Sequence, residues 1–114
     1  MNEFQDLLPL REPTFLILLS LSAGPRHGYA IMKEVESLSE GRVLLSTGTL
    51  YGALQRLLDQ GWIRRTEDLL PNDSGRERKA YELSEPGHKV LAAEVARLEK
   101  LVQVARTQTI RDAR

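Results

Sequence analysis

The stretch from Ser46 to Leu58 constrains the fold more than any other, because its apolar and its flexible positions separate onto two sides of one helix. Its leucines, at positions 50, 54, 57 and 58, recur with helical spacing and form a stripe that faces a core. Ser46 can cap the first turn, and Leu45 can pack on Leu50 as a hydrophobic staple. The sequence therefore predicts an amphipathic helix with a defined start.

The side of this helix away from the leucines is unusual. It carries Gly48, Tyr51, Gly52, Gln55 and Asp59, with Thr49 and Arg56 on its flank. Each exposed glycine destabilises a helix by about 1 kcal/mol relative to alanine, and a face that meets only solvent gains nothing in return. A face that must lie against a groove or another backbone benefits, because the missing side chains allow a closer approach. We therefore predict a DNA recognition helix, which the remaining chain supports or duplicates by dimerisation.

Composition limits the other functions. The 114 residues suffice for one small domain, and 16 basic residues balance 16 acidic ones, so overall charge gives no support for a nucleic-acid partner. The chain has no cysteine, which excludes disulfides and thiolate metal sites, and its two histidines, His27 and His88, are far apart. The sequence offers no nucleophile–base pair and no phosphate-binding loop. We expect neither an enzyme nor a cofactor or metal.

Targeting signals are not evident. The first residues, M-N-E-F-Q-D, lack the basic start of a secretory signal, and the apolar run from Phe15 to Leu21 is too short to span a bilayer. We expect a cytoplasmic protein without a membrane partner.

Two helices are predicted ahead of the recognition helix. Residues 1–12 are an arm that is either mobile or lies across a partner subunit. Pro13 suits a first helical turn, and the run T-F-L-I-L-L-S-L-S after it predicts a helix buried all round with help from a second subunit. After the turn A-G-P-R-H-G, Ile31, Val35 and Leu38 form the stripe of a second helix, with Gly41 at its C′ position.

After Gly61 the periodicity changes from helical to alternating. Residues 62–67 and 78–83 predict two strands joined by a loop that contains L-L-P-N-D-S-G, with Ile63, Tyr81 and Leu83 facing inward and Trp62 in the core. Three helices followed by a hairpin form a winged helix-turn-helix. The predicted fold class is mainly α with a small β-hairpin, plus a C-terminal dimerisation helix.

A final helix is predicted to begin after a Ser84 cap, with Pro86 tolerated in its first turn. Steps of four and three place Leu91, Val95, Leu98, Val102, Ala105 and Thr109 along a coiled-coil-like seam. Each buried leucine or valine contributes about 1.5–3 kcal/mol, so the seam predicts a homodimer. Its expected interface is Phe15, Leu91, Val95, Leu98, Val102 and Ala105. We divide the chain into a DNA-binding domain with its arm, 1–83, and a dimerisation helix, 84–114.

Four segments in this order resemble the PadR family of bacterial transcriptional regulators. They are H-G-Y-A-I at 27–31, G-T-L-Y-G-A-L-Q-R-L at 48–57, D-Q-G-W-I at 59–63 and R-K-A-Y-E-L-S-E-P-G at 78–87. The length, with one C-terminal helix, is similar to that of the short branch of the family. Two positions depart from the family pattern: Gly52 stands where proline is frequent, and Ala80 where an aromatic residue is common.

The resemblance implies a homodimeric winged-helix repressor that binds an inverted-repeat operator. It also implies that Tyr29 touches a DNA phosphate and that residues around Thr47 to Arg56 enter the major groove. Some relatives bind small planar ligands in the dimer cleft, so a small-molecule effector there is a further candidate partner. The last helix here has no aromatic residue to stack on such a ligand, which leaves residues near Phe4 and Phe15 to line a pocket.

The candidate DNA-contacting residues come from three segments. Gln55 can bond adenine bidentately, and arginines and lysines can position the protein on phosphates. The candidates are Tyr29, Ser46, Thr47, Gly48, Thr49, Tyr51, Gln55, Arg56, Arg64, Arg76, Arg78 and Lys79. Ordinary surface polarity, a solvated wing loop and a half-buried Tyr29 are the competing interpretations. Leu69 and Leu70 have no assigned role.

A second function remains open from the sequence. A winged helix can also bind a protein through its groove-facing side, and the neutral net charge favours that alternative. Steep salt dependence of duplex binding would distinguish DNA recognition from protein binding.

Overall fold

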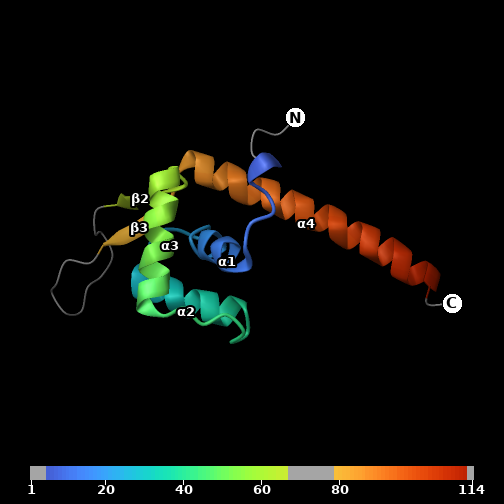
Figure 1. Ribbon diagram of the computed structural model, residues 1–114, viewed down its shortest axis with the longest axis horizontal. Helices are drawn as coiled ribbons and strands as arrows, with labels where there is room; N and C mark the ends of the chain where they lie inside the picture. The colour runs from blue at the N-terminus through green and yellow to red at the C-terminus, as the bar shows by residue number, and fades with distance from the viewer. Residues whose placement is uncertain (1–4, 67–78, 113–114) are drawn as a thin grey trace.

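The computed structural model describes residues 5–66 and 79–112. In chain order it contains η1 (Gln5–Leu7), α1 (Glu12–Ser20), β1 (Arg26–His27), α2 (Gly28–Leu38), α3 (Thr47–Gln60), β2 (Ile63–Thr66), β3 (Ala80–Leu83) and α4 (Glu85–Asp112). Figure 1 shows α1, α2 and α3 gathered beside the small sheet, with α4 extending past them. This is the predicted mainly helical, winged helix-turn-helix architecture.

The hydrophobic core lies between these three helices, the sheet and the first half of α4. The α1 helix packs against α2 and α4 and buries Leu16, Ile17 and Leu18 within its own chain, while Phe15 and Leu19 stay partly exposed. The stripe of α3 faces inward as predicted, with its leucines at 50, 54 and 57 buried and the one at 58 partly buried. The chain itself therefore covers most of α1, and a second subunit is not needed for that.

The C-terminal end of α2 differs from the prediction by one residue. Glu40, and not Gly41, occupies the C′ position, with a left-handed φ of 54°. Its N–H donates to the carbonyl of Ser37 at 3.1 Å, and the N–H of Gly41 donates to that of Glu36 at 2.8 Å, which together form a Schellman motif. Gly41 also has a positive φ, 82°, so it is the second of two consecutive left-handed residues and not the first.

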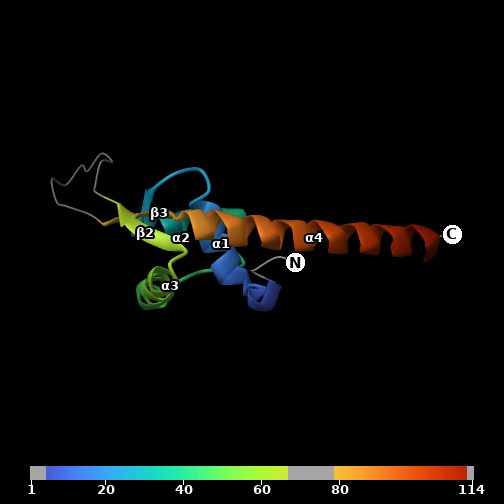
Figure 2. The same ribbon diagram turned by 90° about the horizontal axis from the view of Figure 1, so that it is seen from above.

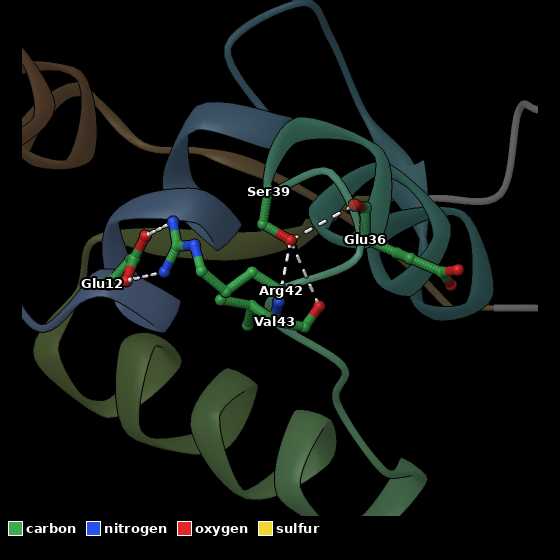
Figure 3. A network of polar contacts seen from close by, with 5 residues as sticks. All are labelled: Glu12, Glu36, Ser39, Arg42 and Val43. Atoms are coloured by element: carbon green, nitrogen blue, oxygen red, sulfur yellow. Dashed lines mark hydrogen bonds and ion pairs between the residues drawn. The ribbon is translucent and has the colours of Figure 1, made fainter.

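The turn between α2 and α3 is held by the polar contacts of two side chains, Ser39 and Arg42 (Figure 3). The hydroxyl of buried Ser39 donates to the carbonyl of Glu36 at 3.2 Å and accepts the N–H of Val43 at 2.9 Å. The guanidinium of Arg42 forms a bidentate ion pair with Glu12 at the start of α1, with Nη1 at 2.7 Å from Oε1. These contacts fix the segment that sets the position of α3 relative to α1 and α2.

The sheet has three antiparallel strands in the order β1-β3-β2, and not the two that were predicted. The extra strand, β1, pairs Arg26 with Tyr81 and His27 with Ala80. The prediction assigned these residues to a turn, because two residues are too few to show an alternating pattern. Pairing on both sides makes β3 central, and Ala80, Tyr81 and Leu83 are buried, as are Ile63 and Trp62. Leu69 and Leu70 lie outside the described residues.

The α4 helix starts where the sheet ends and is fastened there by its cap. The Ser84 hydroxyl accepts the N–H of Gly87 at 3.1 Å, and the Ser84 N–H donates to the carbonyl of Trp62 at 3.0 Å. Gly87 lies directly on this carbonyl: a Cβ there would be 2.9 Å from the carbonyl carbon and closer still to the oxygen, and real Cβ atoms keep at least 3.0 Å. The predicted cap is confirmed, and the glycine permits the close approach.

Farther along, α4 holds the N-terminal segment through a buried carboxylate. Glu94 is 2% exposed, and its carboxylate accepts hydrogen bonds from Arg97 at 2.6 and 3.0 Å and from the N–H of Leu10 at 2.9 Å. The last described part of the arm therefore packs on its own chain. The C-terminal part of α4 projects from the domain, as Figure 2 shows.

The Glu94 carboxylate makes the folded chain sensitive to acid. Hydrogen bonding to Arg97 holds the pKa of Glu94 below its ordinary value of 4.5; burial opposes this, and the Leu10 N–H adds to it. The stabilising contribution is therefore complete above about pH 4.5 and is lost as the pH falls through the lower folded pKa. We expect Glu94→Gln to reduce the dependence of the urea midpoint on pH between about 5 and about 3. Glu99→Gln, which removes an exposed carboxylate from the same helix, is the control; an equal flattening by both would contradict the assignment.

No helix in residues 5–66 and 79–112 is both long and apolar enough to cross a membrane.

Candidate nucleic-acid interface

The outer face of α3 is exposed and takes no part in the core. Ser46 is the N-cap, and its hydroxyl accepts the N–H of Thr49 at 3.1 Å, as predicted. This starts the helix in the register that turns the leucines inward. The residues at 46–49, 51, 52, 55 and 56 are then exposed together, and they include eight of the predicted DNA-contacting or face positions.

The two glycines on this face are not required by crowding within the chain. A Cβ at Gly48 would meet nothing within 4 Å, and one at Gly52 would meet only the mobile end of Arg56, at 4.0 Å. Both also lie inside the helix, where alanine would be favoured by about 1 kcal/mol. Packing among the described residues therefore does not explain the two glycines. A helix face without side chains at these positions lets another molecule approach the backbone closely.

Polar side chains on α3 are oriented by neighbours on the same helix. The Ser46 hydroxyl donates to Thr49 Oγ1 at 2.9 Å, and Gln55 Nε2 donates to Asp59 Oδ1 at 3.0 Å. The Gln55 amide therefore has one donor engaged, and its oxygen remains available as an acceptor. Thr47 makes the first residue of the helix and is exposed.

The start of α2 meets α3 and the wing in a shallow pocket. Its lining is His27, Gly28, Tyr29, Tyr51 and Lys79. The ring of Tyr51 lies over Gly28, where a Cβ would be 2.9 Å from Cζ and closer to the hydroxyl oxygen. Tyr29 is 63% exposed, and the Lys33 ammonium lies 6.0 Å from the centre of its ring. Tyr29, Tyr51 and Lys79 thus line one pocket beside the first turn of α2.

The predicted basic contacts are distributed unevenly. Arg64 of β2 pairs across the strands with Glu82, Nε to Oε2 at 2.7 Å, so much of its charge is balanced locally. Arg56 is exposed on the flank of α3, and Lys79 is exposed next to Tyr51. Arg76 and Arg78 lie outside the described residues. The described basic groups nearest the outer face are therefore Arg56 and Lys79.

Sequence reasoning missed the grouping of Tyr29, Tyr51 and Lys79, together with His27 and Gly28. These residues come from three segments that are distant in the chain, and the pairing of β1 with β3 brings the first and the last of them together. The signal present in the sequence was Gly28 directly before Tyr29, a glycine at a helix start next to an aromatic. The described residues contain no group of three or more His, Cys, Asp or Glu side chains that could hold a metal ion.

The second surface of interest is a groove between α1 and α4. It is lined by Phe15, Val95, Leu98, Glu99, Val102, Gln103 and Arg106. Val95 and Val102 are 37% and 48% exposed, and Ala105 is exposed farther out. Leu91, which was also expected at the dimer interface, is buried in its own core with 7% exposure. Leu91 thus covers the domain, whereas the seam from Val95 onward is exposed or partly exposed.

Known proteins resemble this chain in sequence and in fold. The family model described as "Transcriptional regulator PadR-like family" matches residues 17–93. An uncharacterized 37.1 kDa protein in transposon TN4556 of Streptomyces fradiae is 37% identical over 86 residues, which are 75% of this chain and 23% of that protein. The chain thus spans about a quarter of the length of this curated relative.

Solved structures have the same fold. A PadR family transcription regulator from Clostridium difficile R20291 superposes with a TM-score of 0.70 at 24% identity, covering 87% of this chain and 99% of that one. A PadR-like transcription factor from Bacteroides fragilis gives 0.65 at 26%, covering 82% and 86%. Bacillus subtilis PadR, solved in complex with operator DNA, gives 0.63 at 24%, covering 75% and 47%.

Proposed function

This chain belongs to the PadR-like family of transcriptional regulators, and from that premise we propose that it is a sequence-specific DNA-binding repressor that works in the cytoplasm as a homodimer. Its operator would be an inverted repeat. The observation that carries the proposal is the outer face of α3, which is exposed, bears two glycines that the chain's own packing does not require, and lies beside two tyrosines and a lysine.

In this proposal α3 enters the major groove and reads bases with Tyr51 and Gln55. A glutamine can bond adenine bidentately, which discriminates against a wrong base by about 1–3 kcal/mol. Thr47 and Thr49 would contact base edges or phosphates near the start of the helix, and Gly48 and Gly52 would let the helix backbone approach the groove walls. The complex of the Bacillus subtilis relative with operator DNA supports this assignment of the partner.

Phosphate contacts would come from the elements around α3. Among the described residues no N-cap side chain bonds the N–H groups of the first turn of α2, which is also the positive end of the helix dipole, and Tyr29 would add a hydroxyl there. Arg56, Lys79 and the wing residues Arg76 and Arg78 would add positive charge, with Arg64 contributing less because of its Glu82 pair. Such contacts fix orientation on the duplex but do not read sequence.

The dimer would form through residues 84–114, with 1–83 as the DNA-binding domain. A second copy would cover Phe15, Val95, Leu98, Val102 and Ala105, whose apolar surface is left open in one chain. A two-fold axis through this interface presents two α3 helices to half-sites about 34–36 Å apart, which requires an inverted repeat. A dimer bound at such a site near a promoter would block transcription.

The test is fluorescence anisotropy with duplex DNA from upstream of the protein's own gene. We expect the natural chain to bind with a log–log salt slope near −7, for about eight phosphate contacts per dimer. The double variant Tyr51→Ala, Gln55→Ala should lose about 2–4 kcal/mol of specific binding and keep its salt slope. Thr107→Ala on the distal part of α4 is the control and should bind normally.

Gly52→Ala gives a sharper form of the same experiment, because stability and binding should change in opposite directions. The free energy of unfolding should rise by up to about 1 kcal/mol, while DNA affinity falls. A variant that is both more stable and equally tight in binding would show that the face meets only solvent. No duplex binding at low or high salt by any form, tested on several candidate operators, would favour a protein partner for this face.

A further inference from the structure

Gly28 is the first residue of α2 and is buried, yet its own backbone does not require a glycine. Its φ lies outside the left-handed range that side chains rarely adopt. In a helical conformation alanine is favoured over glycine, because glycine loses more backbone entropy when it is ordered. A residue with a side chain would therefore suit the local conformation, and the reason for the glycine lies in a neighbouring element.

That neighbour is Tyr51 of α3. A Cβ on Gly28 would have three nearest heavy atoms, and all of them belong to the Tyr51 side chain: Cε1 at 3.4 Å, Cζ at 2.9 Å and the hydroxyl oxygen closer still. A methyl group here and the Tyr51 ring in its present place therefore exclude each other. We propose that Gly28 is a positioning residue: its missing side chain lets the Tyr51 ring lie on the start of α2, which fixes the ring for contact with DNA.

The contact at Gly28 differs in kind from the one at Gly87. A Cβ at Gly87 would meet the backbone carbonyl of Trp62, which moves only if the start of α4 or the sheet moves. Tyr51 instead presents the end of a side chain that is 44% exposed and can rotate about its own bonds. A methyl group at position 28 would turn the ring toward solvent and leave the helices in place. The glycine at 28 therefore serves the orientation of one side chain, whereas the glycine at 87 serves the fold.

The orientation of Tyr51 matters because of what surrounds the ring. With the ring over Gly28, Tyr51 shares one pocket with Tyr29 and Lys79 at the N-terminal turn of α2. A side chain that is already held in its binding orientation loses less conformational entropy when a partner arrives than one that rotates freely. Displacement of the ring should therefore weaken DNA binding although no DNA-contacting group is removed. This effect on DNA rests on the proposed function, whereas the contact between Gly28 and the ring does not.

The first experiment tests the contact in the full-length protein without DNA. An aromatic ring shifts the NMR resonances of protons that lie over its face, so the Hα resonances of Gly28 report the position of Tyr51. We expect these resonances to move in Tyr51→Ala and to stay nearly in place in Tyr51→Phe, which keeps the ring. The urea midpoint of Gly28→Ala should be no lower than that of the natural chain. Unmoved resonances in Tyr51→Ala would contradict the contact, and a loss of stability that Gly28→Ala also causes in the Tyr51→Ala background would show a structural role instead.

The second experiment is a double-mutant cycle in DNA affinity, measured by anisotropy. Gly28→Ala and Tyr51→Ala should each weaken binding about tenfold, which is the effect of one lost contact. The double variant should also be about tenfold weaker and not a hundredfold, because the methyl group displaces nothing once the ring is gone. The same methyl group in the Tyr51→Ala background is thus the matched control.

Two results of the cycle would overturn the positioning role: additive losses in the double variant, or natural affinity in Gly28→Ala. A failure of the proposed function is recognised separately. Absence of duplex binding by the natural chain contradicts that function, and the Gly28 resonances then still decide whether the glycine holds the ring.

Discussion

Gly87→Ala is expected to be among the most destabilising single substitutions in the chain. A methyl group at this position would lie within 3.0 Å of the carbonyl group of Trp62, and both partners are backbone. Moving α4 away would weaken the Ser84–Trp62 hydrogen bond, worth about 1 kcal/mol, and the Ser84 cap, worth about another 1. With about 1–3 kcal/mol for overpacking, the expected loss is about 3–5 kcal/mol, measured by urea unfolding.

The matched control is alanine at Gly52, which also lies inside a helix. Gly52→Ala places the same methyl group in open space, so it should be neutral or stabilising. A small domain is stable by only about 5–15 kcal/mol, so Gly87→Ala should also lower the yield of soluble protein. Equal unfolding midpoints for the two variants would show that α4 can shift without loss and that the close contact is unimportant.

Val102→Glu is expected to convert the proposed dimer into a monomer and to abolish tight operator binding. Val102 lies in the open half of the seam, in one groove with Phe15 and Leu98. A glutamate buried there among apolar side chains would cost several kcal/mol, only part of which Arg106, one turn away in the same groove, could offset. Each monomer would then hold a single half-site, and DNA affinity should fall about a hundredfold or more. Sedimentation equilibrium gives the oligomeric state, and anisotropy gives the DNA affinity.

Ala96→Glu provides the control, because it adds the same charge at an exposed position outside the groove on the same helix. It should leave both the mass and the affinity unchanged. A Val102→Glu protein that remains dimeric would move the interface to another surface, such as the exposed row formed by Leu101 and Val104. A monomer with full DNA affinity would instead contradict the requirement for two half-sites.

The elements that could be predicted from sequence are those that depend on local spacing. The α3 stripe, its Ser46 cap and the Ser84 cap each need only residues within one or two turns. The inward positions of Ile63, Tyr81 and Leu83 follow from alternation. All of them are found in the structure.

The missed features depend on contacts between distant segments. β1 has two residues and is a strand only because Arg26 and His27 reach Tyr81 and Ala80. The buried Glu94 looks like a surface position of a heptad until Leu10 and Arg97 satisfy it. Leu91 belongs to a seam, but periodicity cannot distinguish burial against the same chain from burial against a partner. Gly87 is an ordinary helix residue until the Trp62 carbonyl is placed beside it.

For the candidate DNA interface too, local helical spacing could be read from the sequence, whereas contacts between distant segments could not. The exposed positions of α3 follow from one helix period, and they are exposed as predicted. The contact of Tyr51 with Gly28 and the position of Lys79 beside it could not be predicted, because they depend on the sheet that joins α2 to the wing.

The pairing of β1 with β3 has a mechanical consequence. It joins the residues directly before α2 to the strand directly after Lys79, with Arg26 opposite Tyr81 and His27 opposite Ala80. The pairing therefore holds the first turn of α2 next to the base of the wing. If both elements contact DNA as proposed, duplexes whose phosphates match the spacing between them would be bound without distortion, and others would have to be deformed at an energy set by their sequence. The operator would then be selected partly by the stiffness and groove width of base pairs that no side chain touches.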